Sequence, residues 1–165
     1  MKLRLLPLWP AAAVFLADQL VKGLASRLLP LHEPVQVLPG FFSLTLVHNT
    51  GMAFGLGAGR ASALRAVLLA LLSLAAIALL LGYASQAAPG RRGLRLALGL
   101  IVGGALGNIA DRLRLGYVVD FLDFHWRAFS WPAFNVADAC ISVGMGLLLL
   151  DLLRSRPRRP EVSGV

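Results

Sequence analysis

The sequence has few charged residues, few aromatic residues and one cysteine. Only 15% of its 165 residues are charged and 8% are aromatic, and Cys140 is the single cysteine. One cysteine excludes an intrachain disulfide framework and a multi-cysteine zinc site. The few aromatic residues form no motif with basic ones, which argues against nucleic-acid binding although the formal net charge is +8.

Apolar residues are abundant: they make up 58% of the chain, and its mean hydropathy is +0.74. Soluble domains average about 45–50% apolar and roughly 25% charged residues. The composition therefore predicts an integral membrane protein, with one helical domain over residues 1–154 and a polar cytoplasmic tail over 155–165.

A membrane span needs about 20 mostly apolar residues. Four spans are expected near residues 6–26, 62–84, 94–113 and 135–154.

The basic residues predict the orientation of these spans. With four spans both termini share a side, which carries nine basic and two acidic residues, whereas the other side carries seven basic and six acidic residues. Basic residues stay preferentially in the cytoplasm, so both termini are expected there. Asp18, Asp111 and Asp138 then gather at the outer boundary of the membrane. The first span is expected to be a retained helix, because its helical pattern continues through 18–22.

The segments expected outside the membrane contain β-like runs. Residues 35–38 and 41–47 are β-branched and aromatic, with Pro39-Gly40 as a turn, and predict a small sheet over about residues 35–55. Residues 118–124 are another candidate strand. The expected fold is mainly α, with four transmembrane helices and a small extracytoplasmic β-sheet.

Charged groups inside a membrane are costly, so each is a functional hypothesis by default. Asp18 and Lys22 are four residues apart on one helical face and can form an ion pair. Asp111 and Arg112 can likewise neutralise each other, and structural support is the favoured interpretation of both pairs. In the same span Gly99, Gly103 and Gly107 recur at a spacing of four, which allows another helix to approach closely.

Asp138 differs from these acids because no basic residue lies within a helical turn of it. Asn135 offers it only a hydrogen bond. An unpaired carboxylate favours sharing a proton with a second acid, and Asp120 and Asp123, expected to face the same way on their strand, are the available partners. Two acids that share one proton can activate water for peptide hydrolysis. The alternative is a solvated loop aspartate near an N-capping Asp138.

Other chemistries fit less well. The histidines, His32, His48 and His125, lack zinc-ligand spacing, and Cys140 is expected to be a packing residue. A nucleophile elbow and a phosphate-binding loop are both missing. A proton-coupled carrier or channel would distribute acids through the membrane depth. A helical assembly subunit would leave Asp120 and Asp138 without a task.

Five motifs, in order and with matching spacing, resemble the signatures of bacterial lipoprotein signal peptidase, or signal peptidase II, over roughly residues 8–153. They are Asp18-Gln19-Leu20-Val21-Lys22, Asn49-Thr50-Gly51-Met52-Ala53-Phe54, the run 103–112 ending in Gly107-Asn108-Ile109-Ala110-Asp111-Arg112, Val118-Val119-Asp120-Phe121, and Phe134-Asn135-Val136-Ala137-Asp138.

The resemblance implies an aspartic endopeptidase of the bacterial inner membrane, active on its extracytoplasmic side without metal or cofactor. Such enzymes remove signal peptides from diacylglyceryl-modified prolipoproteins, cleaving before the lipidated cysteine. The implied partners are these substrates and membrane lipid, with no nucleic acid, and the implied state is a monomer.

The resemblance also implies roles for individual residues. The catalytic pair would be Asp120 and Asp138, with Asp120 preferred to Asp123. The binding and supporting residues would be Asn49, Gly51, Asn108, Asp111, Arg112, Asn135, Ala137, Asp18 and Lys22, with Asn49 and Arg112 the foremost substrate contacts. Met52, where the family commonly has alanine, and His48 depart from the pattern and are expected to affect substrate preference.

Overall fold

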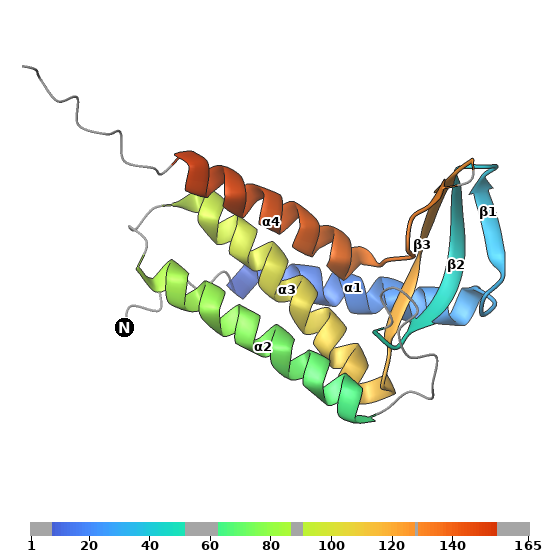
Figure 1. Cartoon of the computed structure of the whole chain (residues 1–165), viewed down its shortest axis with the longest axis horizontal. Coiled ribbons are helices and arrows are strands. Elements are labelled where there is room, and N and C mark those ends of the chain that lie inside the picture. Colours follow the sequence, from blue (N-terminus) through green and yellow to red (C-terminus); the bar gives the residue numbers. More distant parts are fainter. Residues whose placement is uncertain (1–7, 52–62, 87–90, 128, 155–165) are drawn as a thin grey trace, which may run out of the picture.

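The computed structural model describes residues 8–51, 63–86, 91–127 and 129–154. These residues form four helices, which lie side by side as a bundle (Figure 1). The helices are α1 (Leu8–Leu28), α2 (Ala63–Ser85), α3 (Arg92–Leu115) and α4 (Val136–Arg154). The expected class, a mainly helical membrane protein with a small sheet, is confirmed. The start of the expected first span, residue 62 and the tail 155–165 lie outside the described residues.

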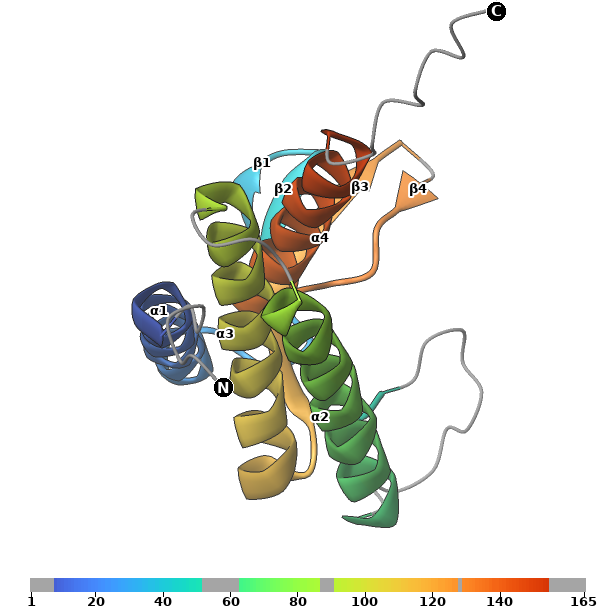
Figure 2. The ribbon, with the colours of Figure 1, turned by 90° about the vertical axis from the view of Figure 1, so that its left-hand side faces the viewer.

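Helix α3 occupies the centre of the bundle. It contacts α1, α2 and α4, and Figure 2 shows these three helices arranged around it. By length and composition α2, α3 and α4 can each cross a membrane, and α2 is the most apolar, with a mean hydropathy of 2.6. Helix α1 carries Asp18 and Lys22, both of which are buried inside the protein. This burial keeps their charges away from lipid, where they would be costly.

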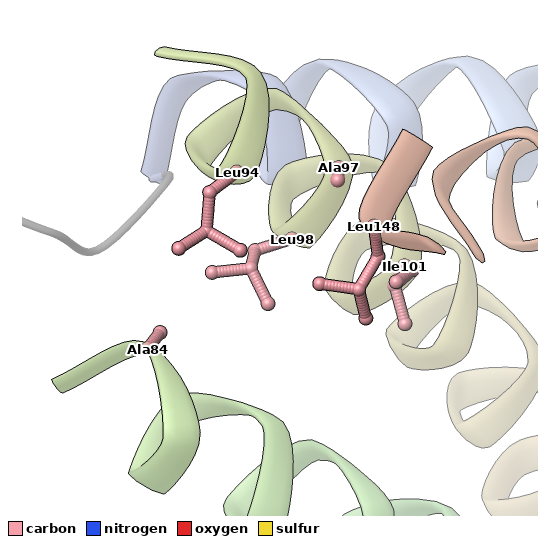
Figure 3. Packing of buried hydrophobic residues seen from close by; sticks show 6 residues of the cluster. All are labelled: Ala84, Leu94, Ala97, Leu98, Ile101 and Leu148. Carbon is pink, nitrogen blue, oxygen red and sulfur yellow. The ribbon is translucent and has the colours of Figure 1, made fainter. Parts of the chain in front are cut away.

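Apolar side chains fill the end of the bundle away from the sheet. Figure 3 shows this cluster, which joins α2, α3 and α4 and consists of Ala84, Leu94, Ala97, Leu98, Ile101 and Leu148. An ion pair between Arg91 and Asp151 links the start of α3 to the end of α4 at the same end. The opposite end of the bundle is left for polar residues.

A four-stranded antiparallel sheet lies at that opposite end (Figure 1). Its order is β1 (Pro34–Leu38), β2 (Phe42–Asn49), β3 (Val118–Trp126) and β4 (Phe129–Ser130). The expected hairpin is present, and Gly40 supplies the positive φ of 73° that its turn needs. Strand β2 ends at Asn49, and 52–55 of the expected β segment lie outside the described residues.

The pairing of β2 with β3 brings the two outer segments together. Asn49 pairs with Val118 and Val47 pairs with Asp120 in the strand register. A β-bulge interrupts the register between Leu44 and Val47. The end of β2 and the start of β3 therefore lie over the polar end of the bundle, where β3 contacts α1 and α3.

Candidate active site

Helix α4 begins at the polar end with a reciprocal cap. Asn135 directly precedes the helix, and its Oδ1 accepts a hydrogen bond from the backbone N–H of Asp138 at 2.9 Å. The Asp138 carboxylate in turn accepts from the backbone N–H of Asn135 at 3.4 Å. This exchange is a capping box, which satisfies amide groups that a helix start leaves unpaired. The N-cap is therefore Asn135, and the interpretation of Asp138 as an N-capping residue is wrong.

Asp120 lies beside this cap and is almost fully buried, with 1% of its surface exposed. Its Oδ1 accepts from Asn135 Nδ2 at 2.7 Å and its Oδ2 accepts from Asn49 Nδ2 at 2.8 Å. Burial, together with the charge of Asp138, raises the pKa of Asp120 to about 6, against the lowering effects of the Asn49 and Asn135 amides and of Lys22. Asn135 thus joins Asp120 to Asp138 directly.

Three asparagine amides surround the two acids in fixed orientations. The carbonyl oxygen of Asn49 accepts from Gly51 N at 2.8 Å, and that of Asn135 accepts from the backbone of Asp138. The carbonyl oxygen of Asn108 accepts from Lys22 Nζ at 2.8 Å, while its Nδ2 donates to Asp138 Oδ1 at 2.8 Å. Because each carbonyl oxygen faces a donor, each NH₂ group faces a carboxylate.

Lys22 is the centre of a buried ion cluster behind the acids. Its Nζ lies 2.9 Å from both Asp18 Oδ2 and Asp111 Oδ2. Asp18 also accepts from the backbone N–H of Ala137 at 2.9 Å, and Asp111 from that of Val119 at 3.2 Å. The expected Asp18–Lys22 pair is present. The expected Asp111–Arg112 pair is wrong, because Asp111 faces Lys22 across the α1–α3 interface, and the ion pairs of the described residues do not include Arg112.

Arg112 faces the site without such a pair. The charges of Asp138, Asp120 and Asp111 all act on its guanidinium, and its Nη1 lies 3.5 Å from the carbonyl oxygen of Asn108. His48 stacks on Tyr117, with ring centroids 4.0 Å apart. Burial lowers the pKa of His48, and the neighbouring His32 adds to this effect. Met52 lies outside the described residues.

Asp123 does not join the candidate pair. Its carboxylate accepts from Thr45 Oγ1 at 2.8 Å on β2. The expectation that Asp120 and Asp123 face the same way is wrong, since strand side chains alternate and residues three apart point to opposite faces. In the strand register Asp123 pairs with Ser43 and Asp120 pairs with Val47. The β-bulge on β2 accounts for the extra residue between these two partners, so the register agrees with the alternation on β3.

An aromatic cavity of about 630 Å³ opens beside Asp138. Among the described residues, it is lined by Phe41, Phe124, His125, Trp126, Phe129, Trp131, Phe134, Asp138, Ala139, Ser142 and Val143. Trp126, Phe129 and Trp131 are largely exposed. The cavity therefore offers an apolar surface that reaches one of the two carboxylates.

The residue patterns alone did not indicate two parts of this site. Gln19 donates to Asp111 Oδ1 at 3.0 Å and accepts from Arg114 at 3.1 Å, so it links α1 to α3. In the sequence, Gln19 stood out only as a member of the motif at 18–22. The rings of Phe124 and Phe134 stack with their centroids 5.8 Å apart, and both residues line the cavity. Because the two residues are not close in the sequence, no local pattern predicted this contact. Within the described part of the chain, no three histidine, cysteine or acidic side chains form a group suited to a metal ion.

The membrane bundle, with its linked acids beneath a small sheet, has the architecture of a membrane-embedded hydrolase. Comparison with known proteins makes this class specific. A family model described as Signal peptidase (SPase) II matches residues 10–154. The chain belongs to this family of aspartic peptidases and is a lipoprotein signal peptidase of the bacterial inner membrane.

Similar proteins cover nearly all of the chain. Lipoprotein signal peptidase of Syntrophotalea carbinolica is 46% identical over 85% of this chain and 86% of its own. That of Pseudomonas aeruginosa strain UCBPP-PA14 is 42% identical over 95% of this chain and 93% of its own. A solved bacterial membrane enzyme structure at 2.3 Å resolution superposes with a TM-score of 0.78, at 27% identity over 94% of this chain and 93% of that one.

Proposed function

We propose that this chain removes signal peptides from diacylglyceryl-modified prolipoproteins by aspartic endopeptidase chemistry, cleaving before the lipidated cysteine. Asp120 and Asp138 are the proposed catalytic pair. The observation that carries the proposal is the Asn135 side chain, which donates to Asp120 at 2.7 Å and accepts from the backbone of Asp138 at 2.9 Å. Asn135 thus contacts both acidic residues, Asp120 on β3 and Asp138 at the start of α4.

The pair activates water as a shared-proton dyad. The ionised carboxylate takes a proton from water as the oxygen attacks the scissile carbonyl carbon, and the protonated carboxyl donates its proton to the carbonyl oxygen. The resulting tetrahedral diol collapses when the C–N bond breaks. The carboxyl that took the proton from water donates it to the cysteine nitrogen, and one diol hydroxyl returns its proton to the other carboxylate. The products are a signal peptide with a new carboxyl terminus and a lipoprotein with a free amino group.

The surroundings of the dyad suit a lipidated peptide. The aromatic cavity beside Asp138 offers apolar surface for the acyl chains or the signal peptide. Asn49, at the end of β2, and Arg112, at the end of α3, are the proposed polar contacts to the substrate backbone. Asn108, Asp111, Asn135, Ala137, Asp18, Lys22 and Gly51 are proposed to support the pocket.

We also propose that the site faces outward and that both termini are cytoplasmic. A substrate whose scissile bond adjoins a membrane anchor must be cleaved near the membrane surface. The described acids Asp18, Asp111, Asp120 and Asp138 belong to one connected network at one end of the bundle. A proton-coupled carrier would distribute its acids along the membrane depth, so this grouping favours the peptidase. The chain is proposed to act as a monomer.

The test is cleavage of a lipidated preprolipoprotein by the purified protein in detergent. Asp120→Asn and Asp138→Asn should each lower kcat by at least about 100-fold, because each removes an acid–base group. Asp123→Asn is the matched control: it lies on the same strand, but its contact is with Thr45, and its activity should stay near that of the wild type.

The outcomes separate the catalytic assignment from the function. If the wild type cleaves but both dyad variants retain its rate, the assignment of Asp120 and Asp138 is wrong. If the wild type, shown to be folded, leaves several lipidated substrates uncut, the peptidase function itself is refuted. An unlipidated version of the same precursor should remain uncleaved, and its efficient cleavage would contradict the proposed substrate class.

A further inference from the structure

Asn108 connects the buried ion cluster to the proposed dyad. Its Oδ1 accepts from Lys22 Nζ at 2.8 Å and from Asn135 Nδ2 at 3.1 Å, and its Nδ2 donates to Asp138 Oδ1 at 2.8 Å. An amide side chain can donate only from its nitrogen and accept only at its oxygen. The direction in which Asn108 faces therefore decides whether Asp138 meets a donor or an acceptor.

Lys22 is suited to fixing that direction. An ammonium group has three donors, and the Lys22 Nζ atom lies within 3 Å of one acceptor on each of Asp18, Asp111 and Asn108. Only 3% of its surface is exposed, so water does not compete for these contacts. The two carboxylates hold the ammonium group in place, and its third donor points at Asn108.

We propose that Lys22 is a positioning residue for catalysis, which acts on Asp138 through the orientation of the Asn108 amide. This role rests on the proposed function and goes beyond the support of the fold expected for Lys22. Without the ammonium group, the carbonyl oxygen of Asn108 keeps only the 3.1 Å contact from Asn135, whose NH₂ group also donates to Asp120 at 2.7 Å. The Asn108 amide can then turn over and present its oxygen to Asp138, and two acceptors face each other. Asp138 loses the donor that orients its carboxylate toward the water and substrate.

The charge of Lys22 also reaches Asp120. The charged groups that act on the Asp120 carboxyl are Asp138 on α4, Lys22 on α1 and Arg112 on α3. Lys22 lowers the pKa of Asp120, so its removal raises that pKa further. A dyad that works with one shared proton keeps it to higher pH when this pKa is higher. The alkaline limb of the pH–rate profile should therefore move to higher pH.

The first test compares Lys22→Met with Arg27→Met, an equal loss of charge at an exposed position of the same helix. Cleavage of a lipidated preprolipoprotein in detergent is measured across pH. For Lys22→Met, kcat should fall by at least about tenfold with KM nearly unchanged, because a buried residue behind Asn108 does not touch the substrate. The alkaline limb should shift upward. Arg27→Met should match the wild type in kcat, in KM and in the position of the alkaline limb.

A second variant separates positioning from charge neutralisation. Lys22→Met with Asp111→Asn keeps the net charge of the cluster, since one positive and one negative charge are removed together. The folded double variant should have a kcat at least about tenfold below that of Asp111→Asn alone. The alkaline limb of its pH–rate profile should still lie at higher pH than that of Asp111→Asn. Equal kcat and equal pH profiles in these two proteins would overturn the positioning role.

Folding outcomes are also decisive. If both Lys22 variants fail to fold while Asp111→Asn folds, Lys22 serves folding and the positioning role is overturned. If Lys22→Met folds and keeps the wild-type kcat and pH profile, the inference is equally refuted while the proposed function stands. The Asp120→Asn and Asp138→Asn results decide the dyad assignment independently of these comparisons.

Discussion

At the scale of the residue, the burial of the proposed catalytic Asp120 carries a cost in stability. Its carboxyl is buried and accepts hydrogen bonds from Asn49 and Asn135, and its pKa is raised from 3.8 to about 6. The folded state therefore binds the proton more tightly than the unfolded state between these pH values. Stability follows the difference in bound protons, so it should fall as pH rises from about 4 to about 6. The loss amounts to roughly 3 kcal/mol.

The variant Asp120→Asn tests this cost, because it removes the titrating group. Relative to the wild type it should gain thermal stability on going from pH 4.5 to 7.5, although its kcat is expected to be low. Comparing the two pH values cancels any constant effect of placing an amide opposite Asn49. Thermal unfolding in detergent measures the difference in Tm between Asp120→Asn and the wild type at each pH. Asp123→Asn is the control and should keep the wild-type pH dependence. An equal difference in Tm at both pH values would contradict the raised pKa of Asp120.

Contacts within one helix could be predicted from the sequence, and those between helices could not. The spacing of four gave the Asp18–Lys22 pair, and the spacing of three gave the contact of Asn135 with Asp138. The contacts of Lys22 with Asp111 and Asn108 join residues at least 86 positions apart. They depend on how α1 docks on α3, which a single sequence does not record.

At the scale of the element, α3 presents glycines to two neighbours at once. A Cβ atom at Gly103 would lie 2.5 Å from the carbonyl oxygen of Ala11 on α1, and one at Gly104 would lie 2.5 Å from that of Ala137 on α4. Successive residues are turned by about 100° around a helix, so adjacent glycines serve different partners. The spacing of four indicated a close approach at Gly103. It gave no indication of Gly104.

Gly104→Ala should push α4 away at Ala137, next to Asp138. The added methyl group overlaps both the Ala137 carbonyl and Ile141, and such overpacking costs about 1–3 kcal/mol. We expect a lower Tm in detergent and a fall in kcat. Gly146→Ala is the matched control, since a methyl group there meets nothing within 4 Å and should leave Tm and cleavage close to wild type. Wild-type kcat in Gly104→Ala would show that the α3–α4 approach does not control the site.

In the sheet, too, local pairing could be predicted from the sequence and long-range pairing could not. The β1–β2 hairpin followed from a turn at Pro39-Gly40 between two β-branched runs. The pairing of β2 with β3 joins segments separated by α2 and α3, and no local pattern determines it. That pairing brings Asn49 to Asp120, so the site is completed by a contact that only the assembled bundle provides.

At the scale of the whole molecule, charge is divided between the two ends of the bundle. Arg91, Arg92 and Arg95 lie where α3 begins and Arg154 lies where α4 ends, away from the sheet (Figure 1). The linked acids lie at the sheet end. Hydropathy and the distribution of basic residues were enough to predict this polarity, because it depends on composition along the chain and on few tertiary contacts.

The polarity predicts the membrane orientation, which fusions to reporter proteins can measure. Green fluorescent protein fused after Val165 should fluoresce, because the C-terminus is expected in the cytoplasm. Alkaline phosphatase at that position should be inactive, whereas alkaline phosphatase fused to a chain cut after Gly40 should be active, since the hairpin is expected outside. Active phosphatase at the C-terminus together with an inactive fusion at Gly40 would invert the topology. The dyad would then face the cytoplasm, where an extracytoplasmic processing reaction could not reach it.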